Sequence, residues 1–568
     1  MRTRVFLILL IGFSLNKHLA AQEASSVEGT VIDARTREPL VGATVALRRD
    51  GAILSGVITD VDGRFAIAGI DPGEALLEVR FVGYRTIEES VKISANRSLR
   101  RRIELEAVPF HLAALEIIGE SAGVYRRLPG AASKLSAQAV DRIAPIGTQE
   151  LLAYVPGIHG FDDDGIGNSR ISIGIRGLNP RRSSRVLILE DGIPIQPALY
   201  LYPNMYYNPP VERIDRVEVI KGSGAIKYGP QTMGGVVNYI TSRPRSSFGT
   251  NSQVTTGTNG YVSVFAEMGG WGGADLKPEV QLLFKRGDGY RENNDFRQLN
   301  GTVKLSYVPD EASVYYVKAN VDVENTSATY TGLTEYTFEN DPDFNPKEND
   351  SFDVFRTSLD LIRTRSHSSR LNATTRAYAS YFDRRWWREF DVFERPGEFD
   401  LHDPSTIDPL PWYSSGNLVR IGGGERNFGN LRTFYTSGVE HTYDLDHVIA
   451  GAGGHLTAGG RLHWERFLDN KKIGESPADR EGLYFRGDPD DPESLEILGQ
   501  SHHYETMSLA LYAVEEVTLG ALSIVPGIRF EAFEQEAIDR LDGARYQDKS
   551  SFVVLPGLGA NYGFGSFN

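Results

Sequence analysis

The most regular pattern in the chain is an alternation of apolar and polar residues after residue 244. In the run 315–324 the odd positions are Tyr, Val, Ala, Val and Val, and the even positions are Tyr, Lys, Asn, Asp and Glu. The run 371–381 alternates in a similar way. A period of two places successive side chains on opposite faces of a β-strand. We therefore predict an antiparallel sheet with one apolar and one polar face over residues 245–568.

Two kinds of protein contain strands of this type. A soluble sheet packs its apolar face on a core, whereas an outer-membrane barrel turns that face to lipid and its polar face inward. Long polar inserts separate the strand-like runs at 334–351, 393–426 and 470–501. Barrels have long outer loops and short periplasmic turns, so in a barrel these inserts are expected to be extracellular.

The N-terminus has the three parts of an export signal. Arg2 and Arg4 precede the apolar run from Val5 to Leu15, and small residues follow up to Ala21. About eleven apolar residues rise only about 16 Å as a helix, too little for a bilayer core. We predict that residues 1–21 are a cleaved signal peptide.

Two further domains are expected between the signal peptide and the alternating strands. Residues 22–106 contain short β-prone runs separated by turn residues, which predicts a small β-sandwich. Residues 122–244 begin with a helix-like run at 148–157 that starts at a threonine and stops at Pro-Gly. Strand-like runs then follow at 171–177, 185–192 and 213–222. This second segment is predicted to be an α/β domain.

Composition narrows the range of functions. The chain has 60 Lys plus Arg against 75 Asp plus Glu, a net charge of −15, which is the wrong sign for neutralising nucleic-acid phosphates. It has no cysteine, so disulfides, cysteine-ligated metals and thiol catalysis are excluded. Gly222 and Gly224 hint at a dinucleotide loop, but Lys227 occupies the sixth position, where that loop has glycine. No catalytic triad or zinc-protease motif is present, so we expect neither an enzyme nor a nucleotide cofactor.

Two segments resemble known families. The runs VEGTVIDARTREPLVGATVAL and GVITDVDGRFAIAGIDPG resemble the carboxypeptidase-regulatory-like domain. The signatures IRGL, VLILEDGIPI, RVEVIKGSGAIKYG and GGVVNYIT resemble the plug of TonB-dependent receptors. The runs RGLNPRRSSR and YGPQTMGGVVN make the ferric-citrate receptor subgroup the most similar one. The resemblance implies a mainly β protein: a small β-sandwich at 22–106, an α/β plug domain at 122–244 and a transmembrane β-barrel at 245–568.

The resemblance also implies active import across the cell outer membrane. The expected ligand is a ferric chelate, ferric citrate or a siderophore, whose iron is carried by the chelator. The expected partners are outer-membrane lipid and a TonB-type energy transducer in the periplasm. The transducer would grip a TonB box in the linker 107–121, because an unpaired strand can recruit another chain by strand addition. The residues of that box are Leu115, Glu116, Ile117, Ile118 and Gly119.

Arginines beside aromatic rings are the candidate ligand contacts, because such groups suit a carboxylate-rich anion through forked hydrogen bonds and stacking. They are Arg181, Arg182, Arg185 and Gln231 in the plug, and Arg384, Arg385, Trp387 and Arg388 at the end of a wall strand. A place in the aromatic girdle at the membrane interface is the alternative for the wall cluster. Arg176, Glu218 and Lys221 are the candidate plug–barrel contacts. Lys221 stands where many family members have Arg, and it is expected to pair with wall carboxylates.

Two other functions stay open, import of a glycan or peptide and a non-transporting outer-membrane adhesin or scaffold. The barrel is also expected to be incomplete. Plugged transporters of this type have about 22 strands, and the residues after 244 supply about 13 or 14 at roughly 22 to 25 residues each. We therefore expect that the native product continues past Asn568 by about 200 residues.

Overall fold

The computed structural model describes residues 25–105, 131–161 and 170–562, apart from gaps. The gaps are 35–36, 41, 50–51, 82–83, 85–86, 96, 274, 311, 328–331, 346, 369, 391–392, 395–418, 421–424, 450–451 and 489. The chain separates into two compact units, Met1–His111 and Leu112–Asn568, which are described in turn. None of the helices within these residues is long and apolar enough to cross a membrane.

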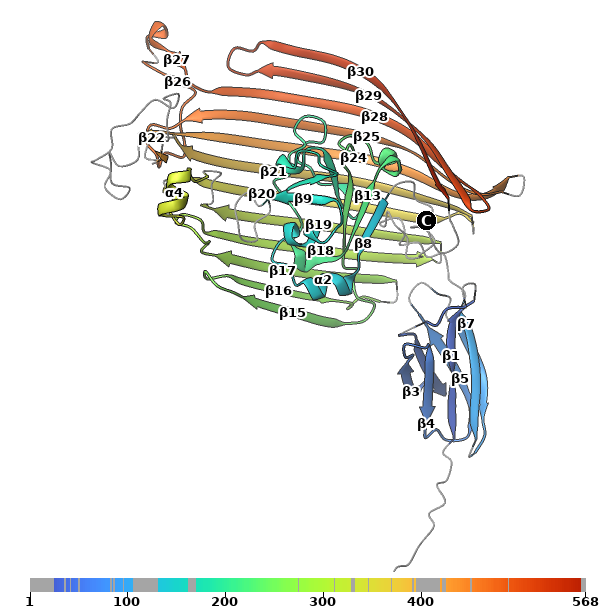
Figure 1. Cartoon of the computed structure of the whole chain (residues 1–568). Coiled ribbons are helices and arrows are strands. Elements are labelled where there is room, and N and C mark those ends of the chain that lie inside the picture. The colour runs from blue at the N-terminus through green and yellow to red at the C-terminus, as the bar shows by residue number, and fades with distance from the viewer. Residues whose placement is uncertain are drawn as a thin grey trace, which may run out of the picture. The chain divides into compact units, whose positions relative to one another are not determined.

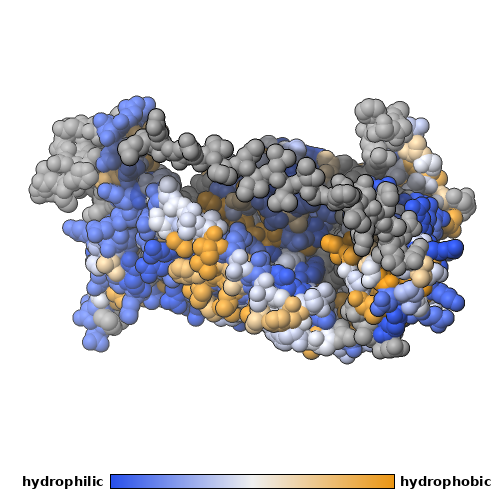
Figure 2. Space-filling view, turned by 90° about the horizontal axis from the view of Figure 1, so that it is seen from below, coloured by the Kyte–Doolittle hydropathy of each residue, from blue (hydrophilic) through white to orange (hydrophobic). Residues whose placement is uncertain are grey.

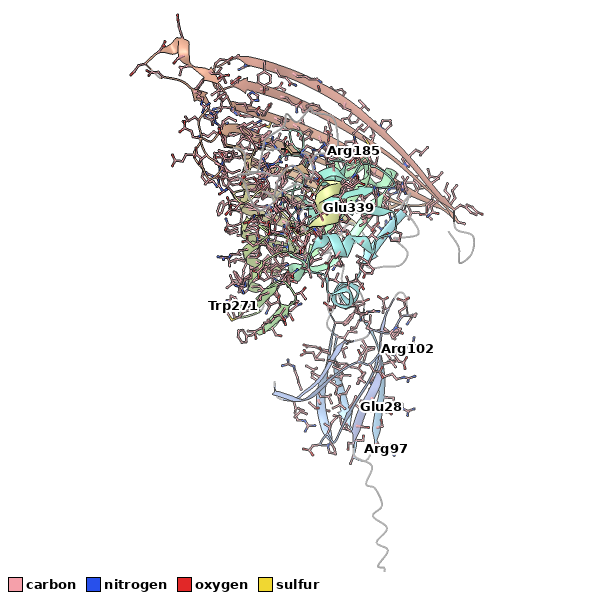
Figure 3. All side chains as sticks on the ribbon, turned by 60° about the vertical axis from the view of Figure 1, so that its left-hand side comes forward. Glu28, Arg97, Arg102, Arg185, Trp271 and Glu339 are labelled. Carbon is pink, nitrogen blue, oxygen red and sulfur yellow. The ribbon has the colours of Figure 1, made fainter. Side chains whose placement is uncertain are left out.

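The first unit is a β-sandwich, as the sequence predicts. Its two sheets have the strand orders β4-β1-β7 and β3-β2-β5-β6. The strands are β1 (Ser26–Asp33), β2 (Thr44–Arg49), β3 (Ala52–Ile58), β4 (Arg64–Ala68), β5 (Gly73–Arg80), β6 (Ile87–Ile93) and β7 (Ser98–Leu105). Alternate apolar residues such as Val27, Val45 and Leu77 form the core between the sheets. Glu28 on β1 pairs with Arg100 on the neighbouring β7 at 2.8 Å, and Figure 3 labels Glu28 and Arg102 on these two strands.

The second unit contains the plug, a five-stranded sheet in the order β12-β11-β14-β13-β8 with short helices around it. Its strands and helices, in chain order, are β8 (Ala131–Leu135), α2 (Ala137–Ile143), α3 (Thr148–Ala153), β9 (Ile158–Phe161), β10 (Ser172–Ile175), η2 (Arg181–Ser183), β11 (Val186–Glu190), β12 (Ile193–Pro194), η3 (Val211–Arg213), β13 (Ile214–Lys221), η4 (Ser223–Tyr228) and β14 (Gly235–Thr241). β11 and β14 are parallel neighbours and are fully buried, which explains the continuous apolar run VLIL of β11.

The rest of the second unit is one antiparallel sheet of twelve strands that curves behind the plug (Figure 1). The strands are β15 (Gly249–Thr256), β16 (Val262–Gly269), β17 (Leu276–Gly287), β18 (Phe296–Asp310), β19 (Ser313–Thr326), β20 (Ser351–Ser366), β21 (Leu371–Glu389), β24 (Asn427–Ile449), β25 (Ala452–Ile473), β28 (Gln500–Leu519), β29 (Leu522–Asp539) and β30 (Arg545–Tyr562). Helix α4 (Glu335–Asn340) and the two-residue strands β22 (Phe393–Glu394), β23 (Val419–Arg420), β26 (Phe485–Arg486) and β27 (Glu496–Ile497) lie in the long connections.

The pattern of burial along these strands distinguishes a membrane barrel from a soluble sheet. On β19 the polar residues are the buried ones: Lys318 is 1% exposed and Asp322 and Glu324 are 0% exposed, whereas Val321 is 44% exposed. A soluble sheet would bury the apolar face instead. In Figure 2 hydrophobic residues gather in patches on the face shown, beside hydrophilic regions. The sheet therefore turns its apolar side outward and its polar side to the plug, as a transmembrane barrel wall does.

The barrel wall does not close among the described residues, because β15 and β30 each pair with a single neighbour. The incomplete barrel is confirmed, but twelve strands replace the expected 13 or 14. The difference comes from strand length, since the estimate assumed strands of about ten residues. β24 has 23 residues and β25 has 22, so the same number of residues forms fewer strands.

Candidate functional site

A buried cluster of charges joins the plug to the wall. Lys318 on β19 donates to Glu190 Oε1 at 2.9 Å and to Asp191 Oδ2 at 2.7 Å, both at the end of plug strand β11. Arg213 Nη2 of the plug donates to the same oxygen, Glu190 Oε1, at 2.7 Å. Burial alone would raise the pKa of Glu190, but the charges of Lys318 and Arg213 lower this pKa to about 2. These carboxylates are therefore ionised at neutral pH and hold the plug electrostatically.

The predicted plug–wall contact through Lys221 has a different place in the structure. Lys221 Nζ donates to Pro156 O at 2.6 Å and to Ser133 Oγ at 3.3 Å, so these bonds lie inside the plug. Burial and the nearby charge of Arg176 lower the Lys221 pKa. Glu218 accepts a bond from Asn238, also within the plug, at 3.5 Å. Among the described residues the ion pairs across the interface have acids on the plug and lysines on the wall: Glu190 and Asp191 with Lys318, and Glu212 with Lys285.

The wall also binds the main chain of the plug. Arg461 Nη1 on β25 donates to Tyr228 O at 3.0 Å, and Arg529 Nη1 on β29 donates to Lys227 O at 2.9 Å. Gly229, directly after these carbonyls, has φ +109°, and an added Cβ there would overlap Arg461 Nη2. The glycine of the YGPQ run thus allows two buried guanidinium groups to reach the plug backbone.

Gly229→Ala is expected to weaken this docking by about 2 kcal/mol, because the methyl group displaces a buried arginine and the backbone is strained. Hydrogen–deuterium exchange of the plug amides around η4 should rise roughly thirtyfold. The matched control is Gly273→Ala, where an added Cβ meets nothing within 4 Å. Equal exchange in the two variants would contradict the role given to Gly229.

An arginine-lined cavity lies between the plug and the wall. Its volume is about 490 Å³. Its lining is Asn179, Arg181, Arg182, Ser184, Arg185, Tyr202 and Asn204 of the plug, and Trp386, Arg388, Asn430 and Arg432 of the wall. None of these residues is acidic. Arg432 pairs with Asp469 at 2.7 Å. The lining itself contributes five guanidinium groups and no carboxylate.

Four of the predicted ligand contacts line this cavity: Arg181, Arg182, Arg185 and Arg388. Arg185, labelled in Figure 3, lies on the plug between η2 and β11. Their role as ligand contacts stays a prediction, but the structure brings together residues that are about 200 positions apart in the chain.

The other predicted contacts lie elsewhere. Arg385 and Trp387 project from the opposite face of β21, because side chains alternate along a strand. Arg385 pairs there with Asp383 at 3.0 Å. The tryptophan that faces the cavity is Trp386. Gln231 makes its hydrogen bond within the plug, where its Nε2 donates to Leu199 O at 3.3 Å.

Arg384 lies next to the cavity but does not line it. It is 0% exposed and sits directly opposite cavity-lining Arg432 in the strand register. Its Nη2 donates to Asn430 O at 3.3 Å, while its Nε and Nη1 have no acceptor among the described residues. Its guanidinium carbon lies 4.6 Å from the centre of the Tyr206 ring, a cation–π distance.

The sequence patterns do not identify six of the cavity residues: Asn179, Ser184, Tyr202, Asn204, Asn430 and Arg432. A weak signal existed for the tyrosines, because Tyr202 and Tyr206 lie in the aromatic run ALYLYPNMYYNPP. Arg432 is paired by strand register with Arg384, and no local pattern reports such a pairing. The TonB box, Leu115 to Gly119, lies outside the described residues, and so does the signal peptide.

Family comparison gives three matches along the chain. The Carboxypeptidase regulatory-like domain matches residues 26–106, the TonB-dependent Receptor Plug Domain matches 125–236, and the TonB dependent receptor-like beta-barrel matches 280–565. The last match covers half of the chain. The protein belongs to the TonB-dependent receptor family, and its barrel fold is that of an outer-membrane protein.

Solved structures and a curated relative agree with this fold. The unliganded ferric citrate transporter FecA has a TM-score of 0.64 and 21% identity, over 79% of this chain and 63% of that one. The closed form of the ferric-catecholate import receptor Fiu from E. coli has a TM-score of 0.59 and 13% identity, over 78% and 64%. The vitamin B12 transporter BtuB of Vibrio vulnificus (strain CMCP6) is 31% identical over 218 residues, 36% of this chain and 32% of the relative. The chain thus spans less than two thirds of each.

Proposed function

We propose that the protein binds an anionic ferric chelate in the arginine-lined cavity and imports it across the outer membrane. The observation that carries this proposal is the charge of the cavity, which has five lining arginines and no lining acid. A guanidinium group binds a carboxylate through two parallel hydrogen bonds. A carboxylate-rich chelate such as ferric citrate would satisfy several of these arginines at once.

Arg384 adds to this argument. A buried guanidinium group with unpaired N–H groups is costly. Arg384 has no ion pair among the described residues, whereas two other buried wall cations of the interface do. Lys318 has three carboxylates, and Arg529 has Glu531 at 2.6 Å. A carboxylate of the ligand that reaches below Trp386 would supply acceptors for Arg384 Nε and Nη1.

Aromatic rings preorganise these arginines. Arg182 lies 5.0 Å from the Tyr206 ring centre, and Arg388 lies 4.8 Å from the Trp386 ring centre. Contact with a ring face holds a guanidinium group in place beside the cavity and lowers the cost of ordering it on binding. The vitamin B12 transporter among the relatives suggests a second class of ligand. The five lining guanidinium groups favour an anionic ligand over a neutral one.

Import would be driven through the linker. In this proposal, ligand binding shifts the population in which Leu115 to Gly119 is available to a TonB-type transducer, which pairs with that strand and pulls on the plug. Energy would come from the inner membrane. The iron would travel inside the chelate, so the protein would need no metal site of its own.

The decisive cellular test is growth with ferric citrate as the sole iron source, with and without the gene. Loss of growth that a plasmid copy restores would support the proposal. Unchanged growth and unchanged uptake of labelled iron would remove ferric citrate as the ligand, and a set of siderophores and glycans could then be tested in the same strains.

Arg388→Gln is expected to weaken binding of ferric citrate roughly tenfold to a hundredfold, because it removes charge-assisted hydrogen bonds. Quenching of tryptophan fluorescence is a suitable readout, since Trp386 lines the cavity. Arg385→Gln is the matched control, because Arg385 lies on the same strand and faces away from the cavity. Equal affinities of the two variants would contradict the proposed site.

A further inference from the structure

One plug segment connects the cavity to the barrel wall. Residues 198–204 form a turn in which Tyr202 N donates to Ala198 O at 3.0 Å. At one end of this segment Tyr202 and Asn204 line the cavity. At the other end the main-chain N–H groups of Tyr200 and Leu201 point to the wall. Any change in the position of these two amides therefore moves cavity-lining side chains.

Both amides are bound by a single wall carboxylate. Glu465 on β25 is 0% exposed. Its Oε1 accepts from Leu201 N at 2.7 Å and from Tyr200 N at 3.0 Å, and its Oε2 lies 3.2 Å from Tyr200 N. Hydrogen bonds from backbone N–H groups to a buried carboxylate are stronger than neutral ones. Glu465 thus fixes the position and orientation of the turn relative to the wall.

The same carboxylate has a partner within the wall. His463 Nε2 lies 3.0 Å from Glu465 Oε2, and His463 Nδ1 lies 2.8 Å from the Tyr378 hydroxyl. One imidazole ring thus bridges the Glu465 carboxylate and the Tyr378 hydroxyl through its two nitrogens. The His463 ring also packs on the Tyr200 ring, with 5.6 Å between centroids. The chain Tyr378, His463 and Glu465 thereby holds the plug turn in one orientation.

The far side of Tyr202 reaches the charged part of the cavity. Its hydroxyl accepts from Arg432 Nη1 at 2.6 Å and lies 2.8 Å from the Tyr206 hydroxyl. Tyr206 stacks in turn beneath Arg182 and Arg384. An anion that attracts these arginines therefore acts on the tyrosine pair, and through the turn on Glu465.

We propose that Glu465 is a positioning residue of the ligand site. The wall carboxylate sets the plug turn so that Tyr202 and Asn204 face the cavity, and it links occupancy of the cavity to His463 and Tyr378 in the wall. The inference rests on the proposed function for its ligand, but the geometry of the turn can be tested without any ligand.

The first experiment is a double-mutant cycle on affinity for ferric citrate. Glu465→Gln replaces the carboxylate by a neutral amide with one acceptor oxygen, so the charge-assisted bonds to Tyr200 N and Leu201 N are weakened, and binding should fall about tenfold. Tyr202→Phe should weaken it by a similar factor. If Glu465 acts through Tyr202, the double variant binds no more weakly than the weaker single variant, because the two residues share one effect. Additive losses would overturn the inference.

Two further variants separate positioning from a general loss of structure. Glu505→Gln removes a wall carboxylate that accepts from Trp464 and Arg466 on β25 without contacting the plug, and it should stay within about twofold of wild type. Tyr378→Phe removes only the last bond of the chain and leaves Glu465 in place. It should weaken binding about threefold, and wild-type affinity in this variant would contradict the link to the wall.

The second experiment needs no ligand. The chain has no cysteine, so Asn204→Cys introduces a single thiol at the cavity. Labelling of this thiol by a water-soluble maleimide should be several times slower in a Glu465→Gln background than in a Glu505→Gln background, because position 204 is then no longer held facing the cavity. If wild type fails to bind ferric citrate, only the proposed ligand is wrong, and the labelling still tests Glu465. Equal labelling rates in the two backgrounds would overturn the positioning role.

Discussion

Ile117→Pro is expected to abolish uptake of ferric citrate while leaving its binding unchanged. Proline removes a main-chain N–H group, and strand addition depends on the unbroken row of such donors. The cavity lining belongs to the plug and the wall among the described residues, so binding is expected to survive the linker substitution. Iron uptake should be followed in cells with labelled ferric citrate, and affinity should be measured on the purified receptor.

Ile117→Ala is the matched control for this experiment, because it shortens the side chain and keeps the N–H group. Uptake by the alanine variant should stay within a few-fold of wild type if main-chain bonds dominate the partner contact. Normal uptake by the proline variant would sink the strand-addition hypothesis. Loss of uptake together with loss of binding would instead show that the linker contributes to the ligand site.

Much of the architecture was predictable because the relevant signal is local. The alternation at 315–324 records which face of β19 meets lipid and which meets the plug, and the structure confirms it residue by residue. The VLIL run of β11 is likewise explained by burial on both faces of the plug sheet. In both cases a residue type reports its own environment, so no knowledge of distant contacts is needed.

The site was less predictable because it depends on contacts between distant residues and on which face of a strand each side chain occupies. The cluster from Arg384 to Arg388 can be recognised in the sequence as a candidate site. Which tryptophan faces inward depends on the strand alternation to within one residue, and in the structure it is Trp386 rather than Trp387. Lys318 and Asp191 meet across 127 positions of sequence. Their charges were visible in the sequence, but no local pattern could match one with the other.

Lys318→Met is expected to destabilise the plug in its docked position by about 3 kcal/mol or more, the cost of leaving buried carboxylates without their cation. Lys318 Nζ serves Glu190, Asp191 and Asp360 at 2.9, 2.7 and 3.2 Å. Hydrogen–deuterium exchange of β11 and β14 reports this loss, and about 3 kcal/mol corresponds to roughly a hundredfold faster exchange. Lys472→Met is the control, because Lys472 donates to a loop carbonyl of Glu481 and not to the plug.

The pH dependence distinguishes a lost charge from a lost side chain. In the wild type the pKa of Glu190 is lowered to about 2, so its stabilising contribution is present above its unfolded pKa of about 4.5 and is lost as the pH falls toward 2. Wild-type exchange should therefore stay constant between pH 7 and pH 5 after correction for the intrinsic rate.

In Lys318→Met the carboxylates lose their main cation and can relieve the penalty by binding a proton, so the excess exchange should shrink as the pH falls. Adding Asp191→Asn to Lys318→Met should reduce the excess exchange at neutral pH, because one uncompensated negative charge is removed. An excess that is independent of pH and unchanged by Asp191→Asn would mean that Lys318 contributes packing and not charge.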